Sequence, residues 1–243
     1  MTPISFRRAS LAVLLFAAST PVSAQIGHDP SRSPYRDILF GKTLTINGGS
    51  VGGDGGKLGI GPHHGTAIGI RYDRRISTPL QVGFTIGYAK LERLIVDAND
   101  SVHKRVSGPV DQRVATFGLD IQFNVTGKKT WHRLAPYAAV GIGLTTSSAT
   151  PADTSGYRFG SKVYLSPAAG VRLFLSNSLH LRVEAREVFW RLKYPTIYLN
   201  QPSMEPGDPL NGTSNAVIQD RRLAQWTGTR QLTVGLGYAV AIF

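Results

Sequence analysis

Strict alternation of apolar residues with polar or very small ones is the feature that most restricts the fold of this 243-residue chain. In the segment 230–243, every even position from Leu232 to Ile242 is apolar, whereas the odd positions carry Gln, Thr, Gly and Ala. A period of two places successive side chains on opposite faces of a β-strand. The segment is therefore predicted to be a strand with one apolar face.

The same alternation recurs along the rest of the chain and predicts an all-β fold. The 27 Gly and 14 Pro of the chain disfavour a long coiled coil or helical bundle. With the last segment, the pattern predicts eight strands. The other seven are predicted at residues 43–47, 68–73, 80–89, 116–125, 138–144, 170–175 and 179–186.

The connections between these segments are alternately short and long, which predicts how the strands are joined. Short connections are expected at 77–79, 127–132 and 176–178, and long ones at 48–65, 91–112, 146–159 and 194–227. An eight-stranded antiparallel up-and-down barrel with both termini at one end has this arrangement. In a bacterial outer membrane, the short turns of such a barrel face the periplasm and the long loops face outside.

The polarity of the two faces indicates which face meets lipid. A soluble barrel has its apolar face inside and its charges outside. An eight-stranded interior holds side chains but no wide pore, and the many Gly and Ala on the non-apolar face leave room there for long charged residues. We therefore place the charges inside, either as specific pairs that plug the lumen or as unpaired residues in a wet interior. The predicted lumen charges are Arg71, Asp73, Asp120, Arg172, Arg182, Glu184 and Arg186.

The N-terminus has the pattern of an export signal. Arg7 and Arg8 precede an apolar stretch at 9–18, and 22–24 (Val-Ser-Ala) fits a cleavage site. The predicted organisation is a signal peptide at 1–24, a periplasmic segment at 25–39 and a transmembrane barrel at 40–243. The formal net charge of +12 raises nucleic-acid binding as a function, but export argues against it. The absence of cysteine excludes disulfides and cysteine-bound zinc.

Aromatic residues near the ends of the predicted strands are expected to form girdles at the two membrane interfaces. These residues are Tyr72, Tyr88, Trp131, Tyr164, Phe189, Trp190, Tyr194, Trp226 and Tyr238.

Taken together, the signal, the eight alternating segments, the alternation of turn lengths and the final segment Tyr238–Phe243 resemble the OmpA/OmpX-like outer-membrane β-barrel proteins. The resemblance covers about residues 40–243. It implies that Tyr238 and the terminal Phe243 form the signal read by the barrel-assembly machinery. Phe243 departs from the family pattern because it is out of phase with the apolar face. Pro167 within a strand and Glu187 on an apolar face are further departures.

Motifs for catalysis or cofactor binding are not matched, so we predict no enzyme, no cofactor and no metal. The glycine-rich run 52–61 lacks the Lys-Ser/Thr register of a phosphate-binding loop. One alternative comes from barrels that resemble this one and modify lipid A as hydrolases or acyltransferases with a serine, a histidine and an acid. Candidates for that chemistry are Ser161, Ser214, His63, His103 and Asp208. A narrow passive porin is the other alternative.

The long loops are the remaining place for function. Their basic residues Arg105, Arg221 and Arg222 are expected to contact lipopolysaccharide phosphates, to which arginine donates charge-assisted hydrogen bonds. The sequence thus predicts a monomeric outer-membrane barrel with a plugged polar lumen and a structural or surface-interaction role. Its expected partners are outer-membrane lipid, lipopolysaccharide and the barrel-assembly machinery.

Overall fold

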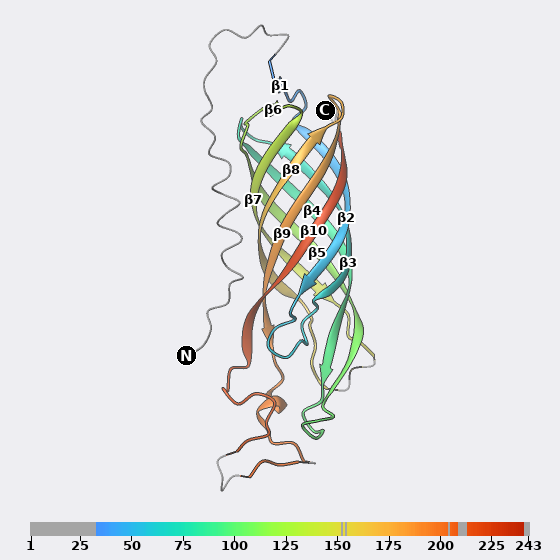
Figure 1. Ribbon diagram of the computed structural model, residues 1–243, viewed down its shortest axis with the longest axis vertical. Helices are drawn as coiled ribbons and strands as arrows, with labels where there is room; N and C mark the ends of the chain where they lie inside the picture. The colour runs from blue at the N-terminus through green and yellow to red at the C-terminus, as the bar shows by residue number, and fades with distance from the viewer. Residues whose placement is uncertain (1–32, 152, 154, 204, 209–212, 241–243) are drawn as a thin grey trace. The chain divides into compact units, whose positions relative to one another are not determined.

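The computed structural model describes residues 33–151, 153, 155–203, 205–208 and 213–240. They form the all-β fold predicted from the sequence: eight long antiparallel strands close into an up-and-down barrel (Figure 1). The barrel strands are β2 (Lys42–Gly53), β3 (His64–Arg75), β4 (Leu80–Val96), β5 (Val106–Asn124), β7 (Leu134–Ser147), β8 (Lys162–Phe174), β9 (Leu179–Lys193) and β10 (Ala224–Ala239). Two short strands, β1 (Tyr35–Asp37) and β6 (Lys129–Trp131), and a 3₁₀ helix, η3 (Thr196–Leu199), complete the described structure.

No helix in the described part of the chain has the length and apolar character needed to cross a membrane.

Pairing between β7 and β8 closes the sheet, and the register fixes the barrel's geometry. Following paired residues once round the barrel from Arg113 on β5 leads back to β5 at Phe123, ten residues further on. A stagger of this size among eight strands corresponds to a strand tilt of about 40°. Closure satisfies the backbone groups that the edges of an open sheet would leave unpaired.

Several strands extend beyond their predicted ends. β4 continues to Val96 and β5 begins at Val106, so much of the predicted loop 91–112 is a hairpin, and its predicted boundaries are wrong.

β8 begins at Lys162, and Pro167 therefore lies inside it. Pro167 pairs with Val140 on β7, but β8–β9 pairing is interrupted between Leu165 and Ala168. The missing proline N–H explains this interruption.

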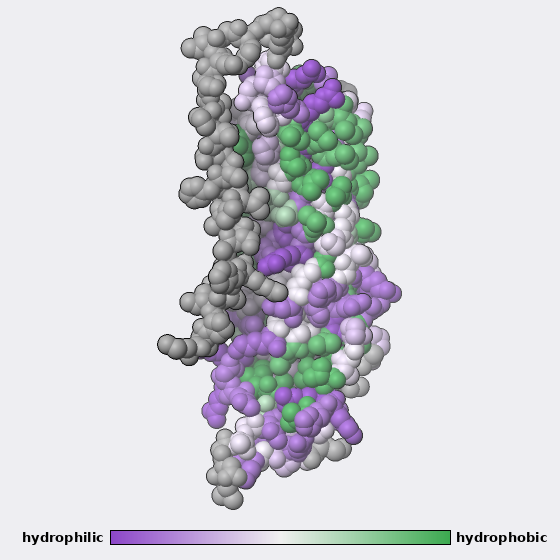
Figure 2. Space-filling view, in the orientation of Figure 1, coloured by the Kyte–Doolittle hydropathy of each residue, from purple (hydrophilic) through white to green (hydrophobic). Residues whose placement is uncertain are grey.

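The two faces of the sheet exchange polarity along the barrel. In the half next to the short turns, β5 directs Phe117, Leu119, Ile121 and Phe123 outward, all about half exposed, and buries Asp120 inside. Figure 2 shows hydrophobic side chains over this half and neutral or hydrophilic ones over the middle of the barrel.

In the half next to the long loops, the interior is largely apolar instead, with Arg93 and Gln112 as buried polar exceptions. Leu91, Trp190 and Leu192 are buried within an apolar cluster there, whereas Lys90 and Glu92 of β4 are exposed. The predicted aromatic girdle is therefore wrong for part of its members. Those that lie buried inside are Tyr164, Trp190 and Tyr194, whereas Tyr88, Trp131, Trp226 and Tyr238 are exposed.

At the short-turn end, part of the predicted periplasmic segment packs onto the barrel. β1 pairs with β6 in the turn between β5 and β7. Ile38 is buried against Ala135 and Phe174, and the Arg75 side chain donates hydrogen bonds to the carbonyls of Ile38 and Phe40 (3.1 and 3.0 Å). The predicted signal peptide, residues 25–32 and Phe243 lie outside the described residues.

Because the apolar band faces lipid, a charge added within the band should destabilise the barrel more than a charge added beyond it. Ile86 points outward in the middle of the apolar band, whereas Glu92 points outward beyond it on the same strand. Replacing Ile86 by Arg should lower the free energy of unfolding by about 2–4 kcal/mol, and Glu92→Arg by about 0–1 kcal/mol. Urea unfolding in lipid vesicles measures both. Equal losses for the two variants would contradict the assignment.

Candidate functional site in the barrel lumen

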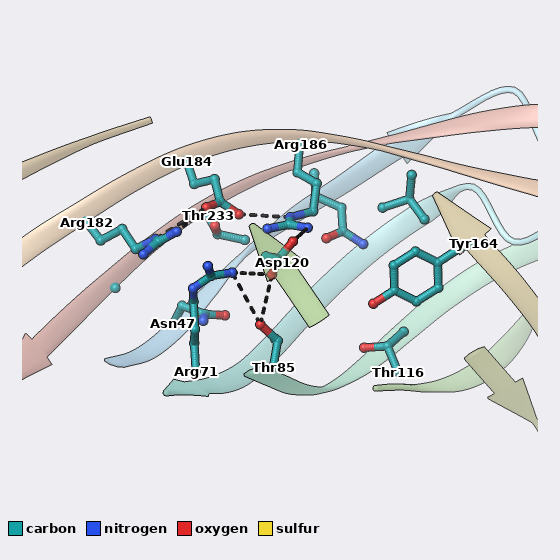
Figure 3. Close-up of a pocket in the computed structure, with 13 residues that line it drawn as sticks. Asn47, Arg71, Thr85, Thr116, Asp120, Tyr164, Arg182, Glu184, Arg186 and Thr233 are labelled. Carbon is teal, nitrogen blue, oxygen red and sulfur yellow. Dashed lines mark hydrogen bonds and ion pairs between the residues drawn. The ribbon is translucent and has the colours of Figure 1, made fainter. Parts of the chain in front are cut away.

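The lumen holds a chain of ion pairs that begins on β3 and crosses to β5 and β9 (Figure 3). Arg71 donates from Nε to Asp73 at 2.8 Å, and its Nη1 contacts Asp120. Asp120 also accepts a hydrogen bond from Arg186 Nη1 at 2.7 Å. Arg71, Asp73 and Asp120 are all at most 2% exposed. Four of the seven predicted lumen charges are thus brought into direct contact.

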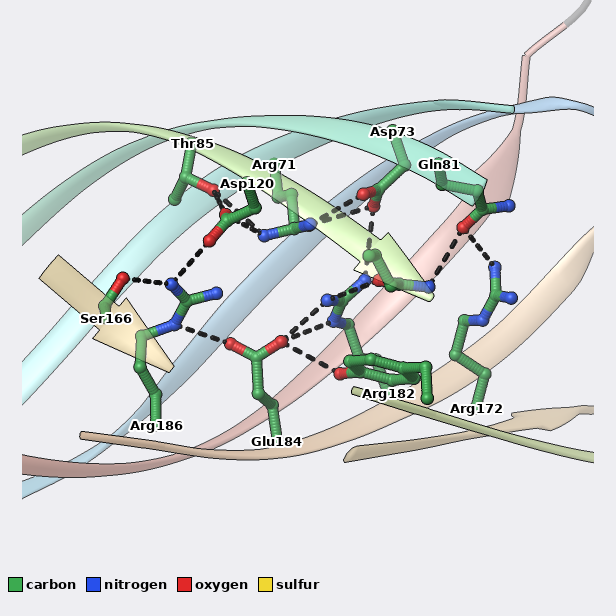
Figure 4. A network of polar contacts seen from close by, with 12 residues as sticks. Arg71, Asp73, Gln81, Thr85, Asp120, Ser166, Arg172, Arg182, Glu184 and Arg186 are labelled. Atoms are coloured by element: carbon green, nitrogen blue, oxygen red, sulfur yellow. Dashed lines mark hydrogen bonds and ion pairs between the residues drawn. The ribbon is translucent and has the colours of Figure 1, made fainter. Parts of the chain in front are cut away.

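The series of ion pairs closes into a ring through residues of β9 (Figure 4). Glu184 accepts from Arg186 Nε at 2.9 Å and from Arg182 Nη2 at 2.6 Å. Arg182 Nη1 then returns to Asp73 at 3.2 Å. Three arginines and three carboxylates alternate in this ring, so each charge has two partners of opposite sign. We call these six residues the ion-pair ring. Its members are Arg71, Asp120, Arg186, Glu184, Arg182 and Asp73.

Neutral groups add hydrogen bonds to the ring. Tyr137 donates to Glu184 at 2.9 Å, Arg186 donates to Ser166 at 2.7 Å, and Arg182 donates to Gln122 at 3.0 Å. Buried charges offset their desolvation only when geometry is good and further hydrogen bonds are made. The ring has these features at Arg182, Glu184 and Arg186, whereas Nη2 of Arg71 is buried without a hydrogen-bond partner among the described residues.

Glycines on neighbouring strands provide the space that the ring occupies. A Cβ at Gly83 on β4 would collide with the Arg71 guanidinium, and one at Gly141 on β7 would collide with Asp120. Arg71 on β3 reaches Asp120 on β5 across β4 because Gly83 has no side chain. The sequence predicts that small residues make room for long charged ones, and Gly83 and Gly141 do so in the structure.

Arg172, the seventh predicted lumen charge, lies outside the ring. It donates to Gln81 at 3.2 Å and to Asn124 at 2.7 Å, and its guanidinium lies 5.7 Å from the centre of the Phe174 ring. Its Nε and the Nε2 of His180 are buried without a hydrogen-bond partner among the described residues. Sequence reasoning missed the supporting roles of Gln81 and Asn124, although both alternate in phase with Asp120 and Gln122.

A small cavity of about 60 Å³ lies beside the ring on its long-loop side (Figure 3). Arg71, Asp120 and Arg186 line it, together with Gln231 and Thr233 of β10. The volume admits a few water molecules, and the buried Val188 and Tyr164 border it toward the loops.

The long loops are tied together above the apolar cluster. Tyr198 of η3 donates to the carbonyl of Val96 at 2.8 Å, and Arg105 donates to the carbonyl of Asn215 at 3.0 Å. Lys57 pairs with Asp220 at 2.9 Å. Of the three predicted lipopolysaccharide-contact residues, Arg105 is therefore half-buried between loops, whereas Arg221 and Arg222 are exposed.

The residues considered for lipid A chemistry are not assembled into a catalytic arrangement. Ser161 hydrogen-bonds Thr146 at 3.0 Å, and Ser214 accepts from Gln201 at 3.0 Å. His63 is engaged with the carbonyl of Gly61 at 2.8 Å. Within the described residues, neither serine has a hydrogen bond to a histidine.

No family model and no curated protein matches the chain. Among solved structures, it is similar to neisserial surface protein A (NspA), with 11% identity over 86% of this chain and 98% of that chain and a TM-score of 0.47. It is also similar to the N-terminal β-barrel domain of Pseudomonas aeruginosa OprF (9% identity, 81% and 97% coverage, TM-score 0.41) and to the outer membrane enzyme PagL (14% identity, 82% and 99% coverage, TM-score 0.41).

These TM-scores are below 0.5, so the fold assignment rests on the sheet and its register. A closed eight-stranded sheet with an apolar outer band and a polar lumen defines an outer-membrane β-barrel. The predicted resemblance to OmpA/OmpX-like barrels is confirmed at the level of the fold, and the bacterial outer membrane is where this barrel resides.

The ring predicts a large effect from one neutral substitution. Glu184→Gln keeps the shape of the side chain but leaves Arg182 and Arg186 each with one carboxylate partner. We expect the free energy of unfolding to fall by about 3–5 kcal/mol. Ser166→Ala, which removes one neutral partner, should cost about 1 kcal/mol. Urea unfolding of refolded barrel measures both, and a Glu184→Gln loss no larger than the control would contradict the ring's role.

The ion pair between Arg93 and Asp153 lies outside the membrane. It predicts that the loop between β7 and β8, which contains Asp153, opens in acid. Burial raises the pKa of Asp153, but hydrogen bonds from Ser155 and Arg93 outweigh this effect, so the pKa of its carboxyl lies below that of a free aspartate. A depressed carboxyl pKa stabilises the folded state above the unfolded pKa, and this stability is lost as pH falls through the folded value. Hydrogen exchange over residues 155–160, corrected for intrinsic rates, should show opening below about pH 4.

Matched variants identify the source of this acid opening. Asp153→Asn should open the loop already at pH 7. Asp111→Asn, which disrupts the exposed pair with Lys90, should leave the loop protected. Loop protection that is independent of pH in the unmodified protein would overturn the interpretation.

Proposed function

We propose that this protein is a non-conducting outer-membrane barrel that holds an ordered group of loops at the cell surface, in a structural or surface-interaction role. Closure of the lumen at three levels is the observation that supports it. Ile38 packs into the short-turn end, the ion-pair ring fills the middle, and the apolar cluster around Trp190 and Leu192 fills the loop end.

The alternatives are less well supported by the contacts in the lumen and loops. A narrow porin needs a continuous aqueous route, whereas the cavity beside the ring holds only a few waters. A lipid A hydrolase or acyltransferase needs a serine activated by a base, and Ser161 and Ser214 are engaged with Thr146 and Gln201 instead.

Lipopolysaccharide is the proposed surface partner of the loops. Arg221 and Arg222 are exposed just before β10 and suit phosphate groups, whereas the guanidinium of Arg105 is already engaged by Asn215. Recognition of Tyr238 and Phe243 by the barrel-assembly machinery remains part of the proposal. Tyr238 is 57% exposed on the outer wall.

Planar-bilayer recording tests the closed lumen. Purified barrel that shows the heat-modifiable gel shift of a folded barrel should give no steady unitary currents, because both the ring and the apolar cluster block ion passage. Steady currents from folded protein would support the porin alternative. Mass spectrometry of lipid A from cells with and without the protein should show the same acyl pattern, and a changed pattern would support the enzyme.

A further inference from the structure

The outward apolar band is unequal around the barrel. On β7 and β8 it spans eleven residues, or ten residue-to-residue rises, from Leu134 to Leu144 and from Val163 to Leu173. On β9 and β10 the uninterrupted band spans only seven residues, or six rises, from Leu179 to Ala185 and from Leu232 to Tyr238. At about 3.3 Å per residue and a tilt of about 40°, these lengths correspond to roughly 25 and 15 Å along the membrane normal.

An ion pair and small residues border the band where it is short. Glu187 and Arg230 are direct partners across β9 and β10 and are joined at 3.3 Å, with the Arg230 side chain 85% exposed. Gly52 on β2 lies opposite Arg230, and a Cβ added there would meet only open space. The wall beside Arg230 therefore carries no side chain at position 52.

Above this ion pair, the same wall carries further cations and two aromatic rings. Arg191 and Lys193 point outward on β9 and are exposed. Trp226, 63% exposed, is paired with Arg191, while Phe189 leans over Gly228. Aromatic rings of this kind are typical of the headgroup level of a membrane. The comparable wall of β4 and β5 instead balances its cations Lys90 and Arg113 with the acids Glu92 and Asp111.

We propose that the β9–β10 wall, bordered by β2, is a docking site for the phosphate groups of an outer-leaflet glycolipid. The short apolar band draws the headgroup boundary about 10 Å deeper here than over β7 and β8, since mismatch is relieved by local thinning of the bilayer. Arg230 and Arg191 then meet the phosphates, and the bare backbone at Gly52 leaves room for the sugar. This inference deepens the proposed contact with lipopolysaccharide by adding a site on the barrel wall to the loop arginines.

Diphosphoryl lipid A in phosphatidylcholine nanodiscs is the probe, and native mass spectrometry measures its Kd for folded barrel. Arg191→Gln/Arg230→Gln should raise the Kd at least tenfold, whereas Lys90→Gln/Arg113→Gln, which also removes two outward cations, should change it less than twofold. Ser50→Leu/Gly52→Leu lengthens the apolar band without altering charge and should also weaken binding. Phosphate-free lipid A should bind all four proteins equally weakly.

Other results would overturn the proposal, and they are distinguishable from failure of the loop contact. If only Arg221→Gln/Arg222→Gln weakens binding, lipopolysaccharide is bound by the loops and the wall site is wrong. If the wall and control variants weaken binding equally, the attraction is non-specific. If the wall variant converts a dimer into a monomer without changing the Kd, the wall is an interface between copies of this chain.

Discussion

Hydrocarbon offers no hydrogen-bond partner to a peptide group, and this constraint determines the rest of the structure. Eight strands close through β7 and β8, and closure leaves only two surfaces, one toward lipid and one toward the axis. Apolar residues such as Leu119 face lipid, so the charges in phase with Asp120 must face one another in a narrow interior. The ion-pair ring is the arrangement that satisfies them there.

The same strands then continue beyond the membrane with the same alternation of inward and outward residues. There the inward residues are mostly apolar and the outward ones polar. On β9, Arg182, Glu184 and Arg186 point inward, and so do Val188, Trp190 and Leu192 further along. The outer half is a barrel with a largely apolar interior and a polar outer face, and it continues from a half with a polar interior and an apolar outer face. This continuity holds the loops in place, because Tyr198 and its neighbours pack on an apolar core that the strands themselves provide.

The period of two predicted the strands and the inward direction of all seven charges, because it is a local property, and the lengths of the connections predicted how the strands are joined. The period of two could not predict which charges pair, since the contact of Arg71 with Asp120 depends on the glycine at position 83 of the strand between them. Nor could it reveal where lipid gives way to water. Trp190 was therefore expected in a girdle although it is buried, and the charged Glu187 looked like a departure although it marks the end of the apolar band.

The apolar face of the strands is assigned to lipid and the charged face to the barrel axis. Spin-label accessibility along β5 tests this assignment most directly. The chain has no cysteine, so single cysteines placed at 117–123 give one label each in reconstituted barrels. Labels at 117, 119, 121 and 123 should collide frequently with oxygen dissolved in the bilayer, and those at 118, 120 and 122 should be protected. The opposite alternation would mean that the apolar face lines the interior and would contradict the account.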